Sequence, residues 1–487
     1  MTRKLEPEFV GRTYDDFLFR PQAGAVTSRR EVSLKTRLSR RLAVELPVVS
    51  ANMDSVTGGR MAKVMALEGG IGIVHRGMPI ERQAESVSKV KRSHGHVVEQ
   101  PLSLPRGATI GEAREFTRNH NITGILIEES RGSGVLAGLL SNRDMPWTSG
   151  QEDRKVDEFM TPASELITGR PDIGVDEAER LMFEHRIEKL PLIDERGRVR
   201  GLITKQDVIL SRRRPYTSKD GKGRLLVGAA IGARGDFLER AAELLRCGAD
   251  VLVVDIAHGH SQVMRQAIEA FRARFGAVEL ICGNVGTAEG ATFLRELGAD
   301  GIKVGIGPGR GCRTRLETAA GVPQLQAIRE AWCAVGDAVP IVADGGVGDD
   351  KDIFLALVCG ASTVMLGSML SGTDEAPGHV ILDPGSGEKR KIYRGMTSPQ
   401  AVFEALYDDT GEAVEAALEV PAEGQEVQIP YRGSVLDILG RIRGHLRSSV
   451  SYGGGEALSE VRARVLEDPL RYLIPLSEAA RRESYDR

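Results

Sequence analysis

The chain has 487 residues, which is about three times the length of a typical domain, so we expect either several domains or one large domain with an insertion. Its formal charge of -3, from 65 Lys and Arg against 68 Asp and Glu, excludes a general attraction to nucleic acids or anionic lipids. Hydrophobic residues make up 41% of the chain, which excludes a disordered protein. The sequence contains no apolar signal or membrane segment, so we expect a cytoplasmic protein.

Eight short apolar segments, most of them followed or preceded by amphipathic stretches, predict eight strand–helix units. Continuous apolar runs of this kind are typical of parallel strands that are buried on both faces. Eight such units close into a barrel, so we predict an α/β protein with a (β/α)8 TIM barrel; an open doubly wound sheet is the alternative. The predicted strands are residues 46–52, 69–75, 225–231, 251–257, 279–285, 301–307, 340–346 and 363–369.

The alternation stops between Arg92 and Leu225, where the chain contains an internal repeat. Residues 108–127 match residues 171–193 at an offset of 65, and each copy closes with a similar unit. Each copy predicts helix, strand, turn, strand and helix, and two such halves can bury each other's apolar faces. The predicted domains are the first part of the barrel at 1–93, the inserted pair at 94–213 with repeats at 94–150 and 155–213, and the rest of the barrel at 214–487.

The glycine-rich loop GIGPGRGCRTR (305–315) is the strongest candidate for chemistry, because barrel enzymes carry their active sites at the C-terminal ends of the strands. Its glycines let the backbone approach a ligand closely. Arg310, Arg313 and Arg315 favour the thiolate form of Cys312, which a nucleophile requires. The alternative is that this cysteine is only a small buried residue.

Two further glycine sites follow the seventh and eighth predicted strands, where barrels frequently bind a phosphate. Asp344 in the sequence DGG could accept from both hydroxyls of a ribose, although the same sequence also fits a simple turn. Other polar residues at strand ends are Asn52, Asp54, Asp255, His258 and Asn284.

The histidine pairs at 94–96 and 258–261 lack carboxylate or cysteine partners at ligand spacing, so we predict polar loops there and no structural metal. The basic run at 211–215 is typical of a solvated linker. No Walker A loop is present, and no dinucleotide-binding glycine motif opens a helix. We therefore expect no nucleic-acid partner.

Several longer motifs resemble the IMP dehydrogenase and GMP reductase family, and the resemblance covers nearly the whole chain. The inserted repeat resembles a tandem pair of CBS domains. Besides the cysteine loop, the motifs are YDDFLFRP (14–21), VVSANMDSVT (48–57), EGGIGIVHRGMPIERQAESVSKVKR (68–92), DIAHGHS (255–261), GNVGTAEGA (283–291), GVPQLQAI (321–328), VADGGV (342–347) and YRGMTS (393–398).

The resemblance implies that Cys312 attacks C2 of a purine mononucleotide and forms a covalent thioimidate, with Thr314 and Glu423 handling ammonia in a reductase. The implied cofactor is NADPH/NADP, or NAD in a dehydrogenase, and its implied contacts are Asp255, Gly305 and Gly307. The implied substrate-binding residues are Ser50, Arg310, Asp344, Gly345, Gly346, Gly367, Ser368, Tyr393, Gly395, Met396 and Thr397. Carbonyls of Gly307, Gly309 and Cys312 resemble a monovalent cation site, such as one for K+.

The inserted pair, by the same resemblance, binds regulatory nucleotides of the ATP or GTP type. Its implied contacts are Asp144, Thr204, Lys205 and Asp207. The resemblance also implies a homotetramer that can pair into an octamer through the insertion.

The predicted active-site flap, at about 397–450, bears on the choice between the two reactions of the family. Dehydrogenases of this family activate water with an Arg–Tyr pair of the flap, whereas residues 397–422 contain no arginine. Together with Thr314 and Glu423 this favours GMP reductase. The motifs at 255–261 and 283–291 look more like the dehydrogenase branch, so IMP dehydrogenase stays the alternative. A paralogue acting on a modified purine nucleotide and a catalytically inert nucleotide sensor are further alternatives.

Overall fold

The computed structural model describes residues 3–93, 101–120, 122–147, 150–206, 208–209, 216–383, 385–398 and 423–485. The chain divides into two compact units. Unit 1 consists of Met1–Lys91, Tyr216–Asp220 and Leu225–Arg487, and unit 2 consists of Arg92–Pro215 and Gly221–Arg224. Among the described residues, no helix has both the length and the apolar character needed to cross a membrane.

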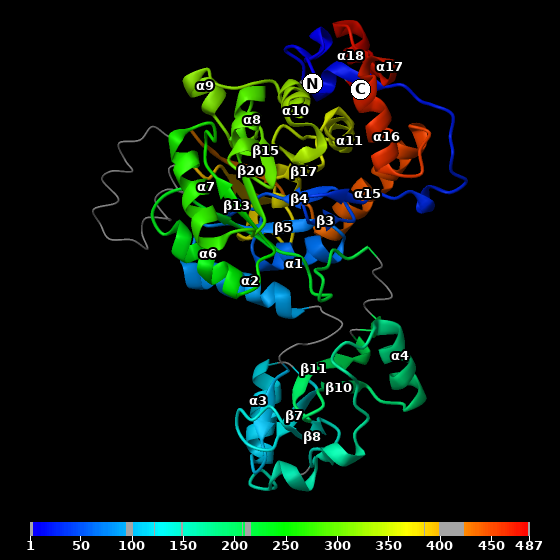
Figure 1. The fold of residues 1–487 in the computed structure, drawn as a ribbon, viewed down its shortest axis with the longest axis vertical. Coiled ribbons are helices and arrows are strands. Elements are labelled where there is room, and N and C mark those ends of the chain that lie inside the picture. Colours follow the sequence, from blue (N-terminus) through cyan, green and yellow to red (C-terminus); the bar gives the residue numbers. More distant parts are fainter. Residues whose placement is uncertain are drawn as a thin grey trace. The chain divides into compact units, whose positions relative to one another are not determined.

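Unit 1 is built on eight parallel strands that close into a barrel (Figure 1). The strands are β4 (Val48–Ser50), β5 (Ile71–Val74), β12 (Gly228–Ile231), β13 (Val251–Asp255), β14 (Leu280–Val285), β15 (Gly301–Val304), β16 (Ile341–Asp344) and β17 (Thr363–Leu366). The last strand pairs with the first, since β17 lies beside β4, and β5 pairs with β12. Each predicted apolar segment contains one of these strands, which confirms the predicted barrel and excludes the open sheet.

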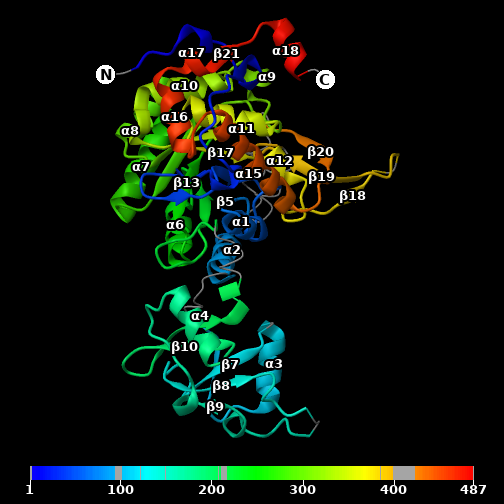
Figure 2. The same ribbon diagram turned by 90° about the vertical axis from the view of Figure 1, so that its right-hand side faces the viewer.

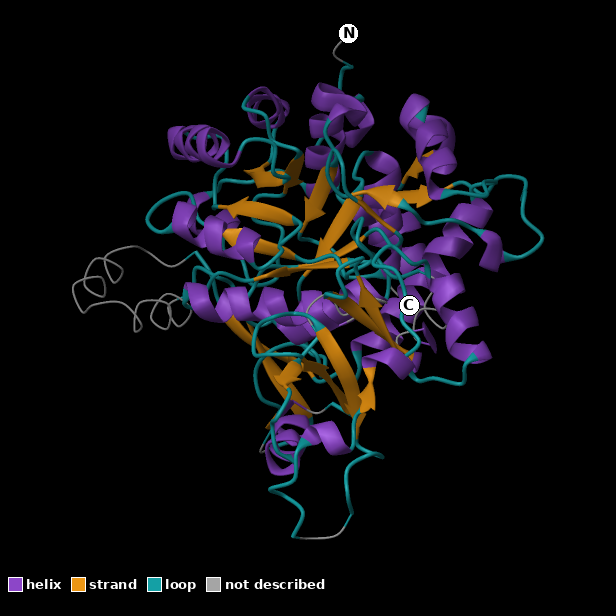
Figure 3. Cartoon of the chain, turned by 60° about the horizontal axis from the view of Figure 1, so that its bottom comes forward, coloured by secondary structure: helices purple, strands orange, loops and turns teal. Residues whose placement is uncertain are grey.

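Helices cover the outside of the barrel, and Figure 3 shows them in purple around the orange strands. The helices that follow the strands are α1 (Gly59–Leu67), α2 (Ile80–Ser93), α6 (Phe237–Arg246), α7 (Gln262–Phe275), α8 (Ala288–Glu296), α10 (Gln324–Val335), α11 (Asp350–Cys359) and α12 (Ser368–Ser371). In α6, the residues Phe237, Ala241 and Leu244 are buried, and their spacing places them on one face of the helix. The serine and threonine before α7 and α8 cap these helices by accepting a backbone hydrogen bond.

Both ends of the chain belong to unit 1 and pair with each other in a small sheet. Strand β1 (Phe17–Phe19) pairs antiparallel with β21 (Leu473–Pro475), and a second small sheet joins β2 (Thr36–Arg37) to β3 (Ala43–Val44). The C-terminal helices are α15 (Val435–Tyr452), α16 (Leu458–Glu467), α17 (Pro469–Tyr472) and α18 (Glu478–Tyr485).

Helix α15 corrects the predicted extent of the flap. The prediction ran to about residue 450, but the structure has a long helix from residue 435, which packs on the barrel through apolar residues including Leu439, Ile442 and Leu446. Because these side chains are buried at helical spacing, this part of the chain belongs to the helices that cover the barrel. Residues 399–422, the centre of the predicted flap, lie outside the described residues.

A three-stranded antiparallel sheet leads to the end of the flap. It consists of β18 (Ile381–Leu382), β19 (Lys389–Arg394) and β20 (Glu426–Pro430), and Figure 2 shows it beside the barrel helices. Strand β19 runs directly into residues 395–398, and β20 begins three residues after Glu423. The sheet thereby fixes both ends of the segment that contains residues 399–422.

Unit 2 contains two similar halves. The first has β6 (Ser103–Pro105), α3 (Ile110–His120), β7 (Gly124–Glu128), β8 (Leu136–Ser141) and β9 (Thr161–Pro162), and the second has α4 (Val175–Glu184), β10 (Lys189–Ile193) and β11 (Val199–Thr204). Each half has its own apolar core, and a small cluster formed by Leu126, Leu136 and Leu202 joins them.

Residues 142–147 of the first half, all described, do not form the predicted closing helix. Residues 142–145 form turns instead, because the Asp144 carboxylate accepts from the backbone and hydroxyl of Ser141, and Pro146 follows directly. In the second half, residues 205–206 and 208–209 are helical, in agreement with the prediction.

Candidate active site

Cys312, Thr314 and Glu423 form a continuous line of polar contacts beyond the end of β15. The Sγ atom of Cys312 lies 3.1 Å from Oγ1 of Thr314. Thr314 Oγ1 in turn donates a hydrogen bond to Oε2 of Glu423 at 2.7 Å. A threonine hydroxyl carries one proton, so its oxygen is left to accept from the cysteine S–H. The arrangement gives the thiol proton a path to the carboxylate.

Backbone contacts hold Glu423 beside the cysteine loop. Cys312 and Gly424 form an isolated antiparallel bridge, and the Arg313 amide donates to the Glu423 carbonyl at 2.7 Å. These contacts extend the sheet of β19 and β20 to the loop. The structure thus brings together all three residues that the sequence predicted to be catalytic.

The three arginines of the loop have separate environments. Arg313 forms an ion pair with Glu317 at 2.7 Å. Arg315 donates to a backbone carbonyl of the loop and interacts electrostatically with Cys312. The side chain of Arg310 is exposed. Arg315 is therefore the arginine that interacts with Cys312, and Arg310 is the one available to an anionic ligand.

At two of the predicted ligand-binding glycines, one on the cofactor side and one on the substrate side, the backbone conformation requires a residue without a side chain. Gly305 has a φ of +149°, and a Cβ there would collide with the backbone oxygen of Asp344. Gly345 has a φ of +89°, and its Cβ would lie 2.9 Å from Cγ of Pro308. The close approach of the two loops, after β15 and after β16, therefore depends on residues without side chains.

The carboxylates of Asp255 and Asp344 share one buried lysine. Nζ of Lys303, on β15, lies 2.7 Å from each carboxylate, and the lysine side chain is 3% exposed. Asn52 donates to Asp255 at 2.7 Å, and Asn284 donates to Asp344 at 2.9 Å. The cluster connects the predicted cofactor residue to the predicted ribose residue through side chains of five different strands or strand ends.

Charge attraction overcomes burial in this cluster. Burial by itself would raise the pKa of Asp255, but the Lys303 ammonium and the Asn52 amide bring that pKa below its ordinary value. Burial would lower the pKa of Lys303, but the two carboxylates raise it above its ordinary value. The lysine is therefore charged throughout the physiological range.

Residues at the end of β19, and residues that follow β17 and β19, lie against the cysteine loop. Tyr393 is buried, and a Cβ on Gly367 would lie 2.8 Å from its hydroxyl. A Cβ on Gly395 would collide with the Gly311 carbonyl, so the two backbones touch. Met396 Sδ accepts from the Asp54 amide at 3.4 Å. These contacts place the predicted substrate-binding residues after β19 directly against the loop that carries Cys312.

The remaining predicted nucleotide contacts lie at the ends of the same elements. Gly346 has a φ of +77° beside Pro308, and Ser368 begins α12 directly after β17. Thr397 is exposed. Thr397 is the last residue but one before the gap in the described residues at 399–422.

Ser50 is the exception among the predicted substrate residues. Its side chain is completely buried, and its Oγ accepts a hydrogen bond from Thr57 at 2.8 Å. Ser50 belongs to β4 itself, so it lies inside the barrel wall below the strand end. Ser50 as a ligand contact therefore stays a prediction, and Asn52, two residues further on, carries the polar side chain that contacts Asp255 at this strand end.

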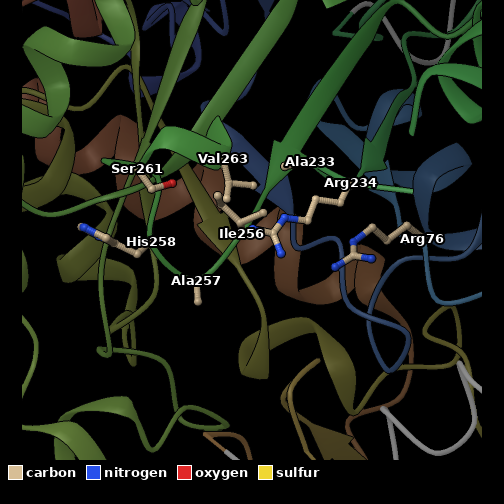
Figure 4. Close-up of a pocket in the computed structure, with 9 residues that line it drawn as sticks. Arg76, Ala233, Arg234, Ile256, Ala257, His258, Ser261 and Val263 are labelled. Carbon is tan, nitrogen blue, oxygen red and sulfur yellow. The ribbon is translucent and has the colours of Figure 1, made fainter. Parts of the chain in front are cut away.

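An open pocket of about 420 Å³ lies over the ends of β12 and β13. Figure 4 shows Arg76 and Arg234 extending into the same space, with His258 and Ser261 further along the wall. Among the described residues, no acidic side chain lines this pocket. Arg76 also acts electrostatically on Asp255, which links the pocket to the lysine cluster. The pocket therefore suits an anionic ligand that extends from Asp255.

The described residues contain no group of three or more His, Cys, Asp or Glu side chains that could hold a metal ion. For the predicted monovalent cation site, the Gly309 carbonyl accepts from the Cys312 amide at 2.9 Å, so one of the three predicted carbonyls is turned into the loop. The site for K+ in this loop stays a prediction.

The predicted regulatory residues lie in unit 2. The Asp144 carboxylate caps the turn after β8, and Thr204 ends β11. Lys205 Nζ lies 3.8 Å from a carboxylate oxygen of Glu188. Asp207 lies outside the described residues.

Sequence reasoning missed Lys303, Arg76 and Arg234. The signal for Lys303 was a single charged residue within the apolar strand sequence GIKVG, where a lysine is buried only when it is paired. The two arginines lie within three residues of the ends of β5 and β12, close to the position that predicted the other site residues.

Comparisons with known proteins identify the family of this chain. A model of the IMP dehydrogenase / GMP reductase domain matches residues 11–485. The inosine-5'-monophosphate dehydrogenase of Nitrosopumilus maritimus is 43% identical over 93% of this chain and 94% of its own, and that of Aquifex aeolicus is 42% identical over 93% and 92%.

Solved structures of a GMP reductase from Trypanosoma brucei are also similar. A variant in complex with guanosine 5'-monophosphate matches with a TM-score of 0.87 and 38% identity, over 98% of this chain and 97% of that chain. The same enzyme in complex with guanosine 5'-triphosphate matches with a TM-score of 0.77 and 34% identity, over 96% and 98%. The chain thus belongs to the IMP dehydrogenase / GMP reductase family and is an oxidoreductase of purine nucleotides.

Proposed function

We propose that this protein is a GMP reductase, which converts GMP and NADPH to IMP, ammonia and NADP. The observation that carries the proposal is the line of contacts from Cys312 through Thr314 to Glu423. A reductase must bring a proton to the departing amino group, and a carboxylate connected to the nucleophile through one hydroxyl can both take and return that proton. The similarity to a GMP reductase over nearly the whole chain supports the proposal.

The first half of the reaction uses this proton path. Glu423 accepts the thiol proton through Thr314, and Sγ of Cys312 forms a bond to C2 of the purine. The proton then returns along the same path to the amino nitrogen, the C2–N bond breaks, and ammonia leaves. The product of this half is a thioimidate between Cys312 and the purine.

The second half restores the cysteine. NADPH, when bound, supplies a hydride to C2, and the C2–S bond breaks to release IMP and the Cys312 thiolate. Arg315, which interacts electrostatically with Cys312, stabilises the negative charge on the departing sulfur. One proton taken up from solvent balances the reaction.

We assign the adenosine half of the cofactor to the pocket over β12 and β13. A dinucleotide whose nicotinamide lies at Cys312 and whose ribose reaches Asp255 extends toward this pocket, where Arg76 and Arg234 meet no acidic wall. Guanidinium groups are strong partners of phosphates. These arginines favour the additional phosphate of NADPH over NADH.

IMP dehydrogenase is the second candidate, and the identity of 43% to a protein of that name favours it. That reaction requires a base for water. The segment 397–422 contains no arginine, so the water-activating Arg–Tyr pair that the family resemblance implies for dehydrogenases is absent from this sequence. This argues against the dehydrogenase.

We further propose that unit 2 is a tandem CBS pair that binds adenine or guanine nucleotides and regulates the barrel. The two similar halves, each with its own core, support this proposal. Addition of ATP or GTP should change the rate of the wild-type enzyme, and Asp144→Ala should weaken this response while the basal rate is retained.

The proposed reaction is tested by incubating the protein with GMP and NADPH, and separately with IMP and NAD, while the absorbance of the reduced nicotinamide is followed. We expect oxidation of NADPH with GMP. Formation of NADH from IMP would contradict the proposal and assign the dehydrogenase reaction.

A further inference from the structure

Lys303 contacts a residue of the predicted cofactor site and a residue of the predicted nucleotide site, and neither site by itself accounts for its position. It is the inward-facing charged residue of β15, and its side chain is 3% exposed, so it is shielded from bulk solvent. Two of its three N–H donors contact carboxylates that belong to different sites, Asp255 on the cofactor side and Asp344 on the nucleotide side. A buried ammonium is stable only with such partners.

The amides around the cluster fix which oxygens remain for ligands. In Asp255, one oxygen contacts Lys303 and the other accepts from Asn52. In Asp344, Oδ2 accepts hydrogen bonds from both Lys303 and Asn284. Among the described residues, Oδ1 of Asp344 makes no hydrogen bond or ion pair, and it is the oxygen that can accept from ribose hydroxyls.

We propose that Lys303 is a positioning residue that couples the two sites, because its ammonium holds the carboxylates of Asp255 and Asp344 in fixed positions, each facing one ligand. This inference rests on the proposed function in that it takes Asp255 and Asp344 as the cofactor and nucleotide contacts. It does not depend on the direction of the reaction.

The physical reason is the charge balance of the cluster. One ammonium faces two carboxylates, so removing it leaves two neighbouring negative groups without their cation. Such a pair takes up a proton at higher pH, because like charges and burial both disfavour the ionised form. A protonated carboxyl accepts fewer hydrogen bonds from ligand hydroxyls, so both ligands lose affinity together.

The test compares Lys303→Met with Lys91→Met, because the chain offers a matched lysine. Lys91 is 4% exposed and contacts Asp220 and Asp250 at 2.9 and 2.7 Å. Asp250 precedes β13, so this cluster lies at the opposite end of the strand from Asp255. Methionine has a similar length and no charge, so the two substitutions remove equivalent groups.

For Lys303→Met we expect the KM values for both nucleotide and cofactor to rise by about tenfold or more, and the acid limb of kcat/KM to move to higher pH by about one unit. Lys303→Arg, which keeps the charge, should restore the acid limb. Lys303→Gln should behave like the methionine variant and replaces it if that variant does not fold. Lys91→Met should leave both KM values unchanged when no regulatory nucleotide is added.

Assays with both GMP plus NADPH and IMP plus NAD separate this inference from the proposed function. Turnover of the second pair would overturn the reductase assignment, and the coupling would still be measured with that pair. The coupling is overturned if Lys303→Met changes the KM of one ligand only, or if its KM values and pH profile match those of Lys91→Met.

Discussion

The two sides of the barrel mouth are built in different ways. The cysteine side, formed by residues 305–315 and 423–425, is closely packed, and its polar groups contact one another. The arginine side, formed by the pocket around Arg76 and Arg234, is open, and its cations face no acidic wall. A site that performs bond chemistry needs groups fixed before the substrate arrives, whereas a site that binds a charged extension needs unsatisfied charge. The difference supports our proposal that the reaction takes place on the cysteine side and that the arginine side binds the cofactor.

The largest expected effect comes from removing the nucleophile on the cysteine side. Cys312→Ala should lower kcat by at least about four orders of magnitude, because no other group on the path can form the bond to C2. The measurement is GMP-dependent oxidation of NADPH. Cys247→Ala, at a partly exposed cysteine of α6's C-terminal end, is the control and should retain activity. Comparable rates for the two variants would contradict the covalent mechanism.

The next effect tests the proton path. Glu423→Gln should lower kcat by about two to three orders of magnitude, because the amide cannot take the thiol proton. Thr314→Val should act in the same direction by breaking the contact between sulfur and carboxylate. Glu426→Gln, at an exposed position of β20, is the matched control. Full activity in Glu423→Gln would exclude this glutamate as the base.

A smaller effect is expected on the arginine side. Arg234→Gln and Arg76→Gln should each raise the KM for NADPH by about tenfold and leave the KM for NADH and kcat nearly unchanged, because a charge-assisted contact to one phosphate is lost. Arg274→Gln, an exposed arginine of α7, serves as the control. An equal change in the KM for NADPH and NADH would show that the pocket does not recognise the additional phosphate.

The last prediction concerns stability and not activity, at His75, which directly follows β5. Burial lowers the pKa of His75 from 6.5 to about 4, so the folded protein holds it neutral. Between these two pH values the unfolded chain binds the proton and the folded chain does not. The contribution of His75 to stability is therefore complete above pH 6.5 and is lost as the pH falls to about 4.

The loss should reach about 3 kcal/mol at the acid end of this range. His75→Asn should thus show a smaller decrease in thermal stability than the wild type when both are measured at neutral and acid pH. An identical decrease in the two proteins would mean that the imidazole is protonated in the folded state.

The sequence predicted those features that depend on local pattern. Each of the eight strands lies inside a predicted apolar segment, since buried parallel strands are continuous in sequence. The contact between Thr314 and Glu423 spans 109 positions and was inferred only from the family resemblance. The periodicity of apolar residues carries no information on a contact between residues so far apart in the sequence.

Other features depend on tertiary contacts. Ser50 carries a polar group near a strand end, but its position within β4 buries it against Thr57. Lys303 is buried because two carboxylates from other strands meet it, which no local pattern shows. The C-terminal bound of the flap was wrong because α15 packs on the barrel.

The central claim, that the cysteine side expels ammonia from a guanine nucleotide, is tested most directly by following nitrogen. The protein is incubated with GMP labelled at the amino nitrogen and with NADPH, and labelled ammonia and NADPH oxidation are measured in the same sample. We predict one labelled ammonia released for each NADPH oxidised, with IMP as the nucleotide product. Turnover of IMP with NAD, without any release of ammonia from GMP, would contradict the account.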